Sequence, residues 1–258
     1  MIKQFSIDNV KIACWINPRD FGSHAQSLIF IHGSGGDHNA WSQQYAKLHK
    51  QFNIVAINLP GHGRSQGSGE KEVASYIQWV KKLLDIVQLK NPILIGHSLG
   101  AAITLSFALN HPQDIKGIVP VGGGLKMPVN AAILEGLKAN PAEFIDLICK
   151  FSLAKENRAR LLEPLKERLS KMNIDVLHGN LVACNKLDLT SDIGKISLPA
   201  LVICGTEDKM MPPDSSRQIA AGIPGAKICL IEGAGHMVML EKPTEFNEAL
   251  SNFASSVC

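Results

Sequence analysis

One short segment carries the residue types of a nucleophilic site. Gly96-His97-Ser98-Leu99-Gly100 has the pattern G-x-S-x-G and lies between the apolar residues 92–95 and 101–109. A serine at the apex of a tight strand-to-helix turn has a strained backbone. Its neighbours two positions away then lie so close together that both must lack side chains. Such strain is typical of sites that use it. We therefore predict that Ser98 is a nucleophile, the alternative being a serine in a purely structural turn.

A serine hydroxyl is a weak nucleophile and needs a base, which an acid in turn must orient. His236 follows the apolar run 226–231, in Gly233-Ala-Gly-His236, and is the predicted base. Asp208 follows the run 201–204, in Gly205-Thr-Glu-Asp208, and is the predicted acid. Glu207 and Asp214 flank Asp208, so each is an alternative acid.

Acyl transfer also needs backbone N–H groups at the position where negative charge develops on the substrate oxygen. Leu99 supplies one such group, because it follows the nucleophile at the start of the predicted helix. The segment His32-Gly33-Ser34-Gly35-Gly36 follows the apolar run 28–31 and is placed to supply the other. We predict that the amides of Ser34 and Leu99 form an oxyanion hole.

The elements that must position these residues alternate between strand and helix. Two short strands, 3–7 and 11–16, are joined at the turn-prone pair Asp8-Asn9. The later predicted strands are apolar throughout, as a parallel sheet covered by helices requires, and they comprise residues 28–31, 53–57, 92–95, 115–121, 201–204 and 226–231. Helical periodicity in residues 72–87 and 244–253 completes an α/β class, in which ligands bind beyond the carboxyl ends of the strands.

Residues 125–191 interrupt this alternation. They contain no convincing strand, and their predicted helices are 130–138, 142–151 and 156–170. A helical block between two sheet strands must leave the sheet and return. We therefore predict one domain, with residues 1–124 and 192–258 as the core and 125–191 as a helical cap. The alternative is that these helices merely cover the sheet.

With these motifs, the chain resembles the α/β-hydrolase fold superfamily over essentially its whole length. Leu59-Pro-Gly-His-Gly-Arg-Ser65 is similar to the segment after the fourth strand in many members, although Asn58 stands where they commonly have Asp. The resemblance implies a mostly parallel eight-stranded sheet with helices on both faces and a helical cap inserted after the sixth strand. The order Ser98, Asp208, His236 is that of this fold's triad.

Among the branches of that superfamily, the motifs are similar to those of small bacterial carboxylesterases, lactonases and cofactor-free haloperoxidase-like members. Ser98 argues against haloalkane dehalogenases and epoxide hydrolases, whose nucleophile is Asp. The predicted activity is hydrolysis of a small carboxylic ester, thioester or lactone through an acyl-enzyme. One alternative is a carbon–carbon bond hydrolase of ring-cleavage diketones, whose cap arginine would be Arg158, Arg160 or Arg168. Another is a non-catalytic small-molecule receptor.

Composition excludes other classes of partner. The 258 residues include 26 Lys and Arg against 23 Asp and Glu, a net charge of +3, which favours neither nucleic acid nor an anionic membrane. No window reaches the roughly 18 apolar residues of a membrane span, and the start lacks the pattern of a signal peptide. The six cysteines are dispersed and include no CxxC pair, so we expect buried thiols and a cytoplasmic location.

Neither a cofactor nor a metal is expected. The sequence contains no G-x-x-x-x-G-K-[ST] segment and no His, Cys and carboxylate spacing of a zinc or EF-hand site. His32 and His97 lie inside motifs, where they are expected to support local hydrogen bonds. His38 is expected at an ordinary surface or helix-end position. The sequence leaves the acyl length and the oligomeric state open.

Overall fold

The computed structural model describes residues 1–90 and 92–257 and is built on one sheet with the order β1-β2-β4-β3-β5-β6-β7-β8. The strands are β1 (Ile2–Ile7), β2 (Val10–Ile16), β3 (Ser27–Ile31), β4 (Asn53–Ile57), β5 (Ile93–His97), β6 (Gly117–Val121), β7 (Leu201–Gly205) and β8 (Lys227–Ile231). β2 is antiparallel to both β1 and β4, and the other neighbouring strands are parallel. The predicted mostly parallel eight-stranded sheet is confirmed.

The strand sequences explain their places in the sheet. Every residue of β3, β4, β5, β6 and β7 is buried, as expected for interior strands with helices on both faces. The edge strand β8 is mostly exposed or half-buried. At the other edge, Asp8 and Asn9 have φ values of 49° and 65°, which the tight hairpin between β1 and β2 requires.

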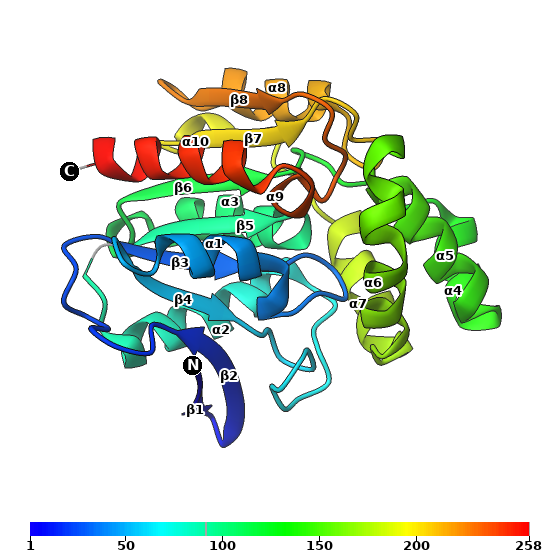
Figure 1. Cartoon of the computed structure of the whole chain (residues 1–258), viewed down its shortest axis with the longest axis horizontal. Helices are drawn as coiled ribbons and strands as arrows, with labels where there is room; N and C mark the ends of the chain where they lie inside the picture. The colour runs from blue at the N-terminus through cyan, green and yellow to red at the C-terminus, as the bar shows by residue number, and fades with distance from the viewer. Residues whose placement is uncertain (91, 258) are drawn as a thin grey trace.

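Helices cover both faces of the sheet (Figure 1). α1 (Ser42–Leu48), α9 (Val238–Glu241) and α10 (Pro243–Ser256) lie in front of it, and α2 (Val73–Val87), α3 (Leu99–Asn110) and α8 (Pro213–Gly222) lie behind it. Each layer has its own apolar core, with Trp41 and Phe246 in front and Tyr76 and Phe107 behind. The core is otherwise mostly aliphatic.

Four helices lie between β6 and β7 and form the block at the right of Figure 1: α4 (Ala131–Ala139), α5 (Pro141–Ser152), α6 (Arg158–Ser170) and α7 (Ile174–Asn185). The first three match predicted segments, but α7 was not predicted. The two ends of this block lie side by side, because Leu189 N donates to Leu125 O (2.9 Å) and Lys126 Nζ lies 2.9 Å from Asp188 Oδ2. These four helices and the segments that connect them, residues 131–185, are called the cap below.

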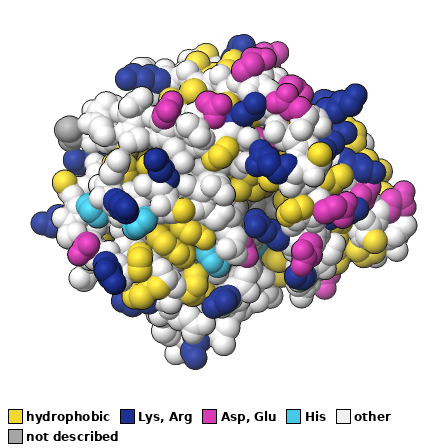
Figure 2. All heavy atoms as spheres, viewed as in Figure 1, with side chains coloured by type: hydrophobic (Ala, Val, Ile, Leu, Met, Phe, Trp, Pro, Cys, Tyr) yellow, Lys and Arg dark blue, Asp and Glu magenta, His cyan; other side chains and the backbone are white. Residues whose placement is uncertain are grey.

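The surface in the same view carries side chains of both charges, scattered over the core and the cap (Figure 2). No helix within the described residues is long and apolar enough to cross a membrane. Cys14, Cys149, Cys184 and Cys204 are buried free thiols, as predicted, whereas Cys229 is a half-buried free thiol. The expectation for Cys258 lies outside the described residues.

Candidate active site

The turn between β5 and α3 has the geometry predicted for a nucleophile. Ser98 has φ 54° and ψ −113°, a conformation that L residues rarely adopt. A Cβ on Gly96 would lie 1.9 Å from Gly100 O, and one on Gly100 would lie 2.3 Å from Ile31 O. Both glycines are therefore required for the turn to form, and the turn places the half-buried Ser98 at the carboxyl end of β5.

The predicted acid and base are in direct contact. Asp208 Oδ2 and His236 Nδ1 are 2.8 Å apart, and both residues are 3% exposed. The other carboxylate oxygen, Oδ1, accepts hydrogen bonds from the amides of Met210 (2.9 Å) and Met211 (2.8 Å). These amides fix the orientation of the carboxylate. Because a carboxylate accepts hydrogen bonds, Nδ1 carries the imidazole proton and leaves Nε2 as the basic nitrogen.

The two alternative acids lie elsewhere. Glu207 and Asp214 are exposed, and Asp214 lies 3.8 Å from Arg217 in an exposed ion pair. Gly122, which has φ +55°, follows β6 and lies against the acid–base pair. A Cβ at this position would be 3.1 Å from His236 Nδ1 and 3.3 Å from Asp208 Oδ2. Asp208 is therefore the carboxylate that the structure brings to His236.

Ser98 and His236 line the same cavity, which has a volume of about 500 Å³. The Ser98 hydroxyl makes no hydrogen bond to any described residue, so the structure brings these two side chains to one cavity without a direct bond between them. Hydrogen bonds between a nucleophile and its base are often long without substrate and tighten in the reacting complex. The arrangement therefore fits a nucleophile that is engaged when substrate binds.

The predicted oxyanion donors are backbone amides without a partner. Neither Ser34 N nor Leu99 N donates a hydrogen bond within the described residues. Leu99 is the first residue of α3, where amides have no acceptor inside the helix. A Cβ on Gly33 would lie 2.7 Å from His97 Nδ1 and 3.1 Å from Ser98 Cβ, so this glycine lets the loop approach the nucleophile closely. Two free amides near the serine are what an oxyanion requires.

Two buried histidines support these loops, as predicted. His97 Nε2 donates to His236 O at 3.0 Å, and His32 Nδ1 donates to Gly33 O at 2.8 Å. His32 Nε2 accepts from Leu59 N at 3.1 Å, which fixes its tautomer. Burial lowers the pKa of both His32 and His97 well below the usual value, so both are neutral. Their hydrogen bonds hold the backbone on either side of Ser98.

His38 lies at a helix end, one of the two expected positions, because it begins the 3-10 helix His38–Trp41, but it is buried and not at the surface. This residue is 7% exposed, and both its amide (2.7 Å) and its Nδ1 (2.8 Å) contact Asn58 Oδ1. The partner in both contacts is 20 positions away in the sequence. Asn58 is the position at which the chain departs from the superfamily pattern, and its side-chain oxygen here contacts both the amide and the ring of His38.

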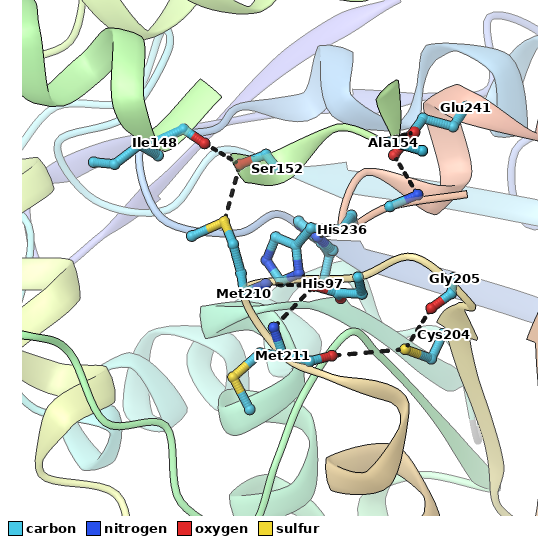
Figure 3. Close-up of polar contacts among 12 residues, drawn as sticks. His97, Ile148, Ser152, Ala154, Cys204, Gly205, Met210, Met211, His236 and Glu241 are labelled. Carbon is cyan, nitrogen blue, oxygen red and sulfur yellow. Dashed lines mark hydrogen bonds and ion pairs between the residues drawn. The ribbon is translucent and has the colours of Figure 1, made fainter. Parts of the chain in front are cut away.

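A buried carboxylate joins the His236 loop to the cap. Glu241 is 3% exposed, and it accepts hydrogen bonds from Gly235 N at Oε1 (3.0 Å) and from Ala154 N and Asn157 Nδ2 at Oε2 (2.9 Å each). Figure 3 shows Glu241 beside Ala154, next to the His236 loop. Burial raises the pKa of Glu241, and these hydrogen bonds oppose that rise. No motif or spacing in the sequence singles out this residue.

A buried amide joins the oxyanion loop to the cap. Asn180 of α7 accepts from Gly35 N (3.0 Å) at Oδ1, which also contacts His62 Nε2 (2.8 Å). Its Nδ2 donates to the Tyr76 hydroxyl at 2.7 Å. Asn180 is fully buried and lies on the helix that was not predicted. A segment with Asn, Gly and His among apolar residues gives little amphipathic signal, so sequence reasoning missed it.

The cavity between core and cap has a mostly apolar lining. Aliphatic side chains and thiols of the cap form much of it, and Met210, Met211 and Met237 contribute from the core. Within the described residues, no Phe, Tyr or Trp lines it. Arg168 and Lys171 are the lining residues with a basic side chain besides the histidines, and Lys171 is paired with Glu167 at 2.6 Å. In the part of the chain that the structure describes, no group of three or more His, Cys, Asp or Glu residues could hold a metal ion.

Comparison with solved structures adds a close likeness. The structure superposes on one described as a thermophilic esterase with a TM-score of 0.88 and 32% sequence identity, covering 100% of this chain and 98% of that one.

Curated relatives carry other activities. A 2-hydroxy-6-oxononadienedioate/2-hydroxy-6-oxononatrienedioate hydrolase of Paraburkholderia phymatum is 25% identical over 261 residues, covering 92% of this chain and 90% of that protein. The dihydrolipoyllysine-residue acetyltransferase component of the acetoin cleaving system of Pseudomonas putida is 28% identical over 250 residues. That match covers 90% of this chain and 64% of the relative, so the chain spans under two thirds of that protein.

A family model provides the assignment. The model described as the alpha/beta hydrolase family matches residues 28–249, which is most of the chain and includes every predicted site residue. The chain belongs to the alpha/beta hydrolase family.

Proposed function

We propose that this hydrolase cleaves a small carboxylic ester, with Ser98, His236 and Asp208 as a catalytic triad. The observation that carries the proposal is the strained Ser98 turn at a cavity that it shares with the His236–Asp208 pair. The resemblance to a thermophilic esterase supports an ester as the substrate class. Thioesters and lactones share the same acyl chemistry, so they belong to the substrates to be tried.

The proposed mechanism follows from the placement of each group. His236 Nε2 removes the proton of the Ser98 hydroxyl as Oγ attacks the acyl carbon, and Asp208 stabilises the charged imidazole. The amides of Ser34 and Leu99 bind the oxyanion. His236 then gives the proton to the leaving alcohol as the ester C–O bond breaks. Water, deprotonated by His236, then attacks the acyl carbon. The bond from that carbon to Ser98 Oγ breaks, Oγ takes the proton back from His236, and the carboxylic acid is released.

Substitution of the nucleophile tests this proposal. We expect Ser98→Ala to lower kcat for p-nitrophenyl butyrate by about 10⁴-fold or more, because the nucleophile is lost while the fold is kept. A fluorophosphonate probe should label the native protein at Ser98 and leave the variant unlabelled. Ser251→Ala is the matched control, since Ser251 lies on α10, does not line the cavity and should keep the activity. Undiminished hydrolysis by Ser98→Ala would refute the triad.

A carbon–carbon bond hydrolase is the second candidate. The Paraburkholderia phymatum relative carries such a name, and Arg168 lines the cavity with a side chain that makes no hydrogen bond or ion pair to a described residue. The other two cap arginines bind backbone, Arg158 at Lys150 O and Arg160 at Leu240 O and Glu241 O. This candidate would be favoured if the protein hydrolysed a vinylogous diketone acid and did not cleave simple esters. The diketone activity should then be lost in Arg168→Ala.

A non-catalytic receptor remains the third reading of the motifs. It requires that Ser98 fail to react, so the fluorophosphonate probe separates it from both hydrolases.

The placement of the cap at residues 125–191 is likewise a proposal, supported by the hydrogen bond between Leu189 N and Leu125 O. In this arrangement the cap forms one wall of the cavity, and therefore selects the substrate.

A further inference from the structure

The wall of the cavity differs on the two sides of Ser98. On the side of the oxyanion loop, the cap lies directly against Gly35. A Cβ there would be 2.4 Å from Leu169 Cδ1 and 3.0 Å from Leu177 Cδ1. Next to it, Ser34 Oγ lies 4.0 Å from Cys184 Sγ. This side therefore contains two leucines and a thiol carried by α6 and α7, and Met172, which packs against the same leucine cluster, also lines the cavity.

On the side of His236, the wall is rich in methionine. Met237 follows the base in the chain, and Met210 N donates to Asp208 Oδ1. Figure 3 shows the hydroxyl of Ser152, at the end of α5, between Ile148 and Met210, and the Ser152 Oγ–Met210 Sδ distance is 3.0 Å. Met237 N also donates to Ser152 O at 3.2 Å. Two unbranched thioether side chains thus border the base.

The two sides also differ in exposure. Leu169 (7%), Leu177 (1%) and Cys184 (3%) are buried, so these three side chains form a closed stretch of the wall at the oxyanion loop, with the exposed Arg168 and Lys171 at its rim. Met210 and Met237 are half-buried, so the wall near the base is more exposed than this closed stretch, although Met211 is buried. Closed walls of branched side chains in a packed core resist rearrangement. Methionine has three flexible side-chain torsions and adapts to different shapes.

Chemistry assigns one half of an ester to each side. The carbonyl oxygen must point to the amides of Ser34 and Leu99, and His236 must reach the oxygen of the leaving alcohol to protonate it. The alcohol therefore lies on the methionine side. The acyl chain must leave the carbonyl carbon in the direction away from His236, where Leu169, Leu177 and Cys184 line the cavity.

We propose that the enzyme selects its substrate by the acyl half, taking an unbranched aliphatic acyl chain of limited length, and accepts alcohols of varied shape. This inference rests on the proposed ester hydrolysis. Within the closed leucine-lined side, each methylene that is buried should raise kcat/KM about fourfold, equivalent to ~0.8 kcal/mol. Beyond the length that this side accommodates, kcat/KM should fall steeply. On the more exposed methionine side, added alcohol carbons remain partly in water and change kcat/KM little.

Two orthogonal ester series test this division. The first keeps p-nitrophenol and varies the acyl group from acetyl through butyryl, hexanoyl and octanoyl to dodecanoyl, with benzoyl as the aromatic member. The second keeps butyryl and varies the alcohol through ethyl, butyl, octyl and benzyl, with acid release followed by pH-stat. We expect a sharp optimum in the acyl series with a spread of about 60-fold, the value for three buried methylenes, and a spread below about tenfold in the alcohol series.

Matched variants assign the selectivity to each wall. Leu177→Ala enlarges the closed side and should move the acyl optimum to a longer chain while the alcohol profile keeps its shape. Leu177→Val is the milder variant, to be used if the alanine variant does not fold. Met237→Leu keeps the volume but adds a branch, and should widen the spread over alcohols while the acyl optimum stays in place.

Three results would overturn the proposal. They are an alcohol spread equal to or larger than the acyl spread, a preference for benzoyl over alkyl acyl groups, and a Leu177 variant that changes the alcohol profile instead of the acyl one. Each of these still shows Ser98-dependent hydrolysis, so each leaves the proposed function standing. Absence of both ester hydrolysis and fluorophosphonate labelling would refute the function and this inference together.

Discussion

The cap holds the two catalytic loops by different chemistry. At the His236 loop, the Glu241 carboxylate accepts from three N–H donors, two of them in the cap, and pairs with no cation among the described residues. At the oxyanion loop, the neutral amide of Asn180 accepts from Gly35 N and donates to the Tyr76 hydroxyl. At the first junction both oxygens of Glu241 act as hydrogen-bond acceptors. At the second, the Asn180 side chain acts both as an acceptor and as a donor.

This difference determines what each junction tolerates. A charge that is buried without a counter-ion is costly unless hydrogen bonds satisfy it, so the Glu241 junction depends on all of its donors. The Asn180 junction carries no charge, and its loss leaves neutral groups that water can satisfy. Both loops bear groups that must be placed accurately for acyl transfer. We therefore expect substitutions at the Glu241 junction, which holds the His236 loop, to affect stability and catalysis more than substitutions at the Asn180 junction.

The largest effect should follow from Glu241→Gln. The new amide nitrogen would face an N–H donor and leave it without an acceptor, which should lower the free energy of unfolding by about 2 kcal/mol. Displacement of the His236 loop should lower kcat by about 10²-fold with little change in KM, because misplacement of a catalytic group by about 1 Å has an effect of that size. Urea unfolding and steady-state ester hydrolysis measure the two quantities.

Glu156→Gln is the matched control for this variant. Glu156 is an exposed carboxylate in the same region, 3.1 Å from Lys242 Nζ, and such pairs contribute about 0–1 kcal/mol. It should leave kcat unchanged. The rate at which a fluorophosphonate labels Ser98 should fall in Glu241→Gln in parallel with kcat, as a positioning role requires. A folded Glu241→Gln protein with native kcat would show that Glu241 only stabilises the fold.

A smaller effect is expected at Asn180. Asn180→Ala removes the acceptor of Gly35 N and should lower kcat by about tenfold, since the oxyanion loop keeps its other support from His32. Asn185→Ala on the same helix is the control, because Asn185 is exposed and accepts from Val129 N at 2.9 Å, outside the oxyanion loop. If Asn180→Ala lowered kcat more than Glu241→Gln does, the ranking of the two junctions would be reversed.

The sequence predicted the parts of the site that depend on local pattern. The Ser98 turn, the glycines around it and the apolar strands each lie within a few residues, and backbone geometry alone demands them. The two junctions could not be predicted in this way. Ala154 and Glu241 are 87 residues apart, and Gly35 and Asn180 are 145 residues apart. Whether such polar residues are buried and paired depends on how the cap packs.

The cap itself shows the same limit. Helices α4, α5 and α6 match predicted segments, and Pro141 begins α5 as a proline at the first helical position can. α7 is buried along most of its length, so its apolar residues do not alternate with a solvent-facing side. A helix without a polar face has no helical periodicity to detect. The helix that holds the oxyanion loop was therefore the least visible in the sequence.

The smallest effect concerns the pH dependence of stability at the Glu241 junction. Burial raises the pKa of Glu241 in the folded protein above the usual value for Glu, so the folded state holds its proton at a pH where the unfolded state has lost it. Its contribution to stability is therefore fully present below the usual Glu pKa and decreases as the pH rises through the folded value. The glutamine in Glu241→Gln does not titrate, so the unfolding free energy of the variant has no pH dependence from this position. The difference in unfolding free energy between native protein and variant should thus narrow as the pH rises through that window, in urea titrations at a series of pH values. A difference that widens instead would mean that the three donors outweigh burial and hold the pKa below its usual value, which would make the carboxylate junction the more robust one.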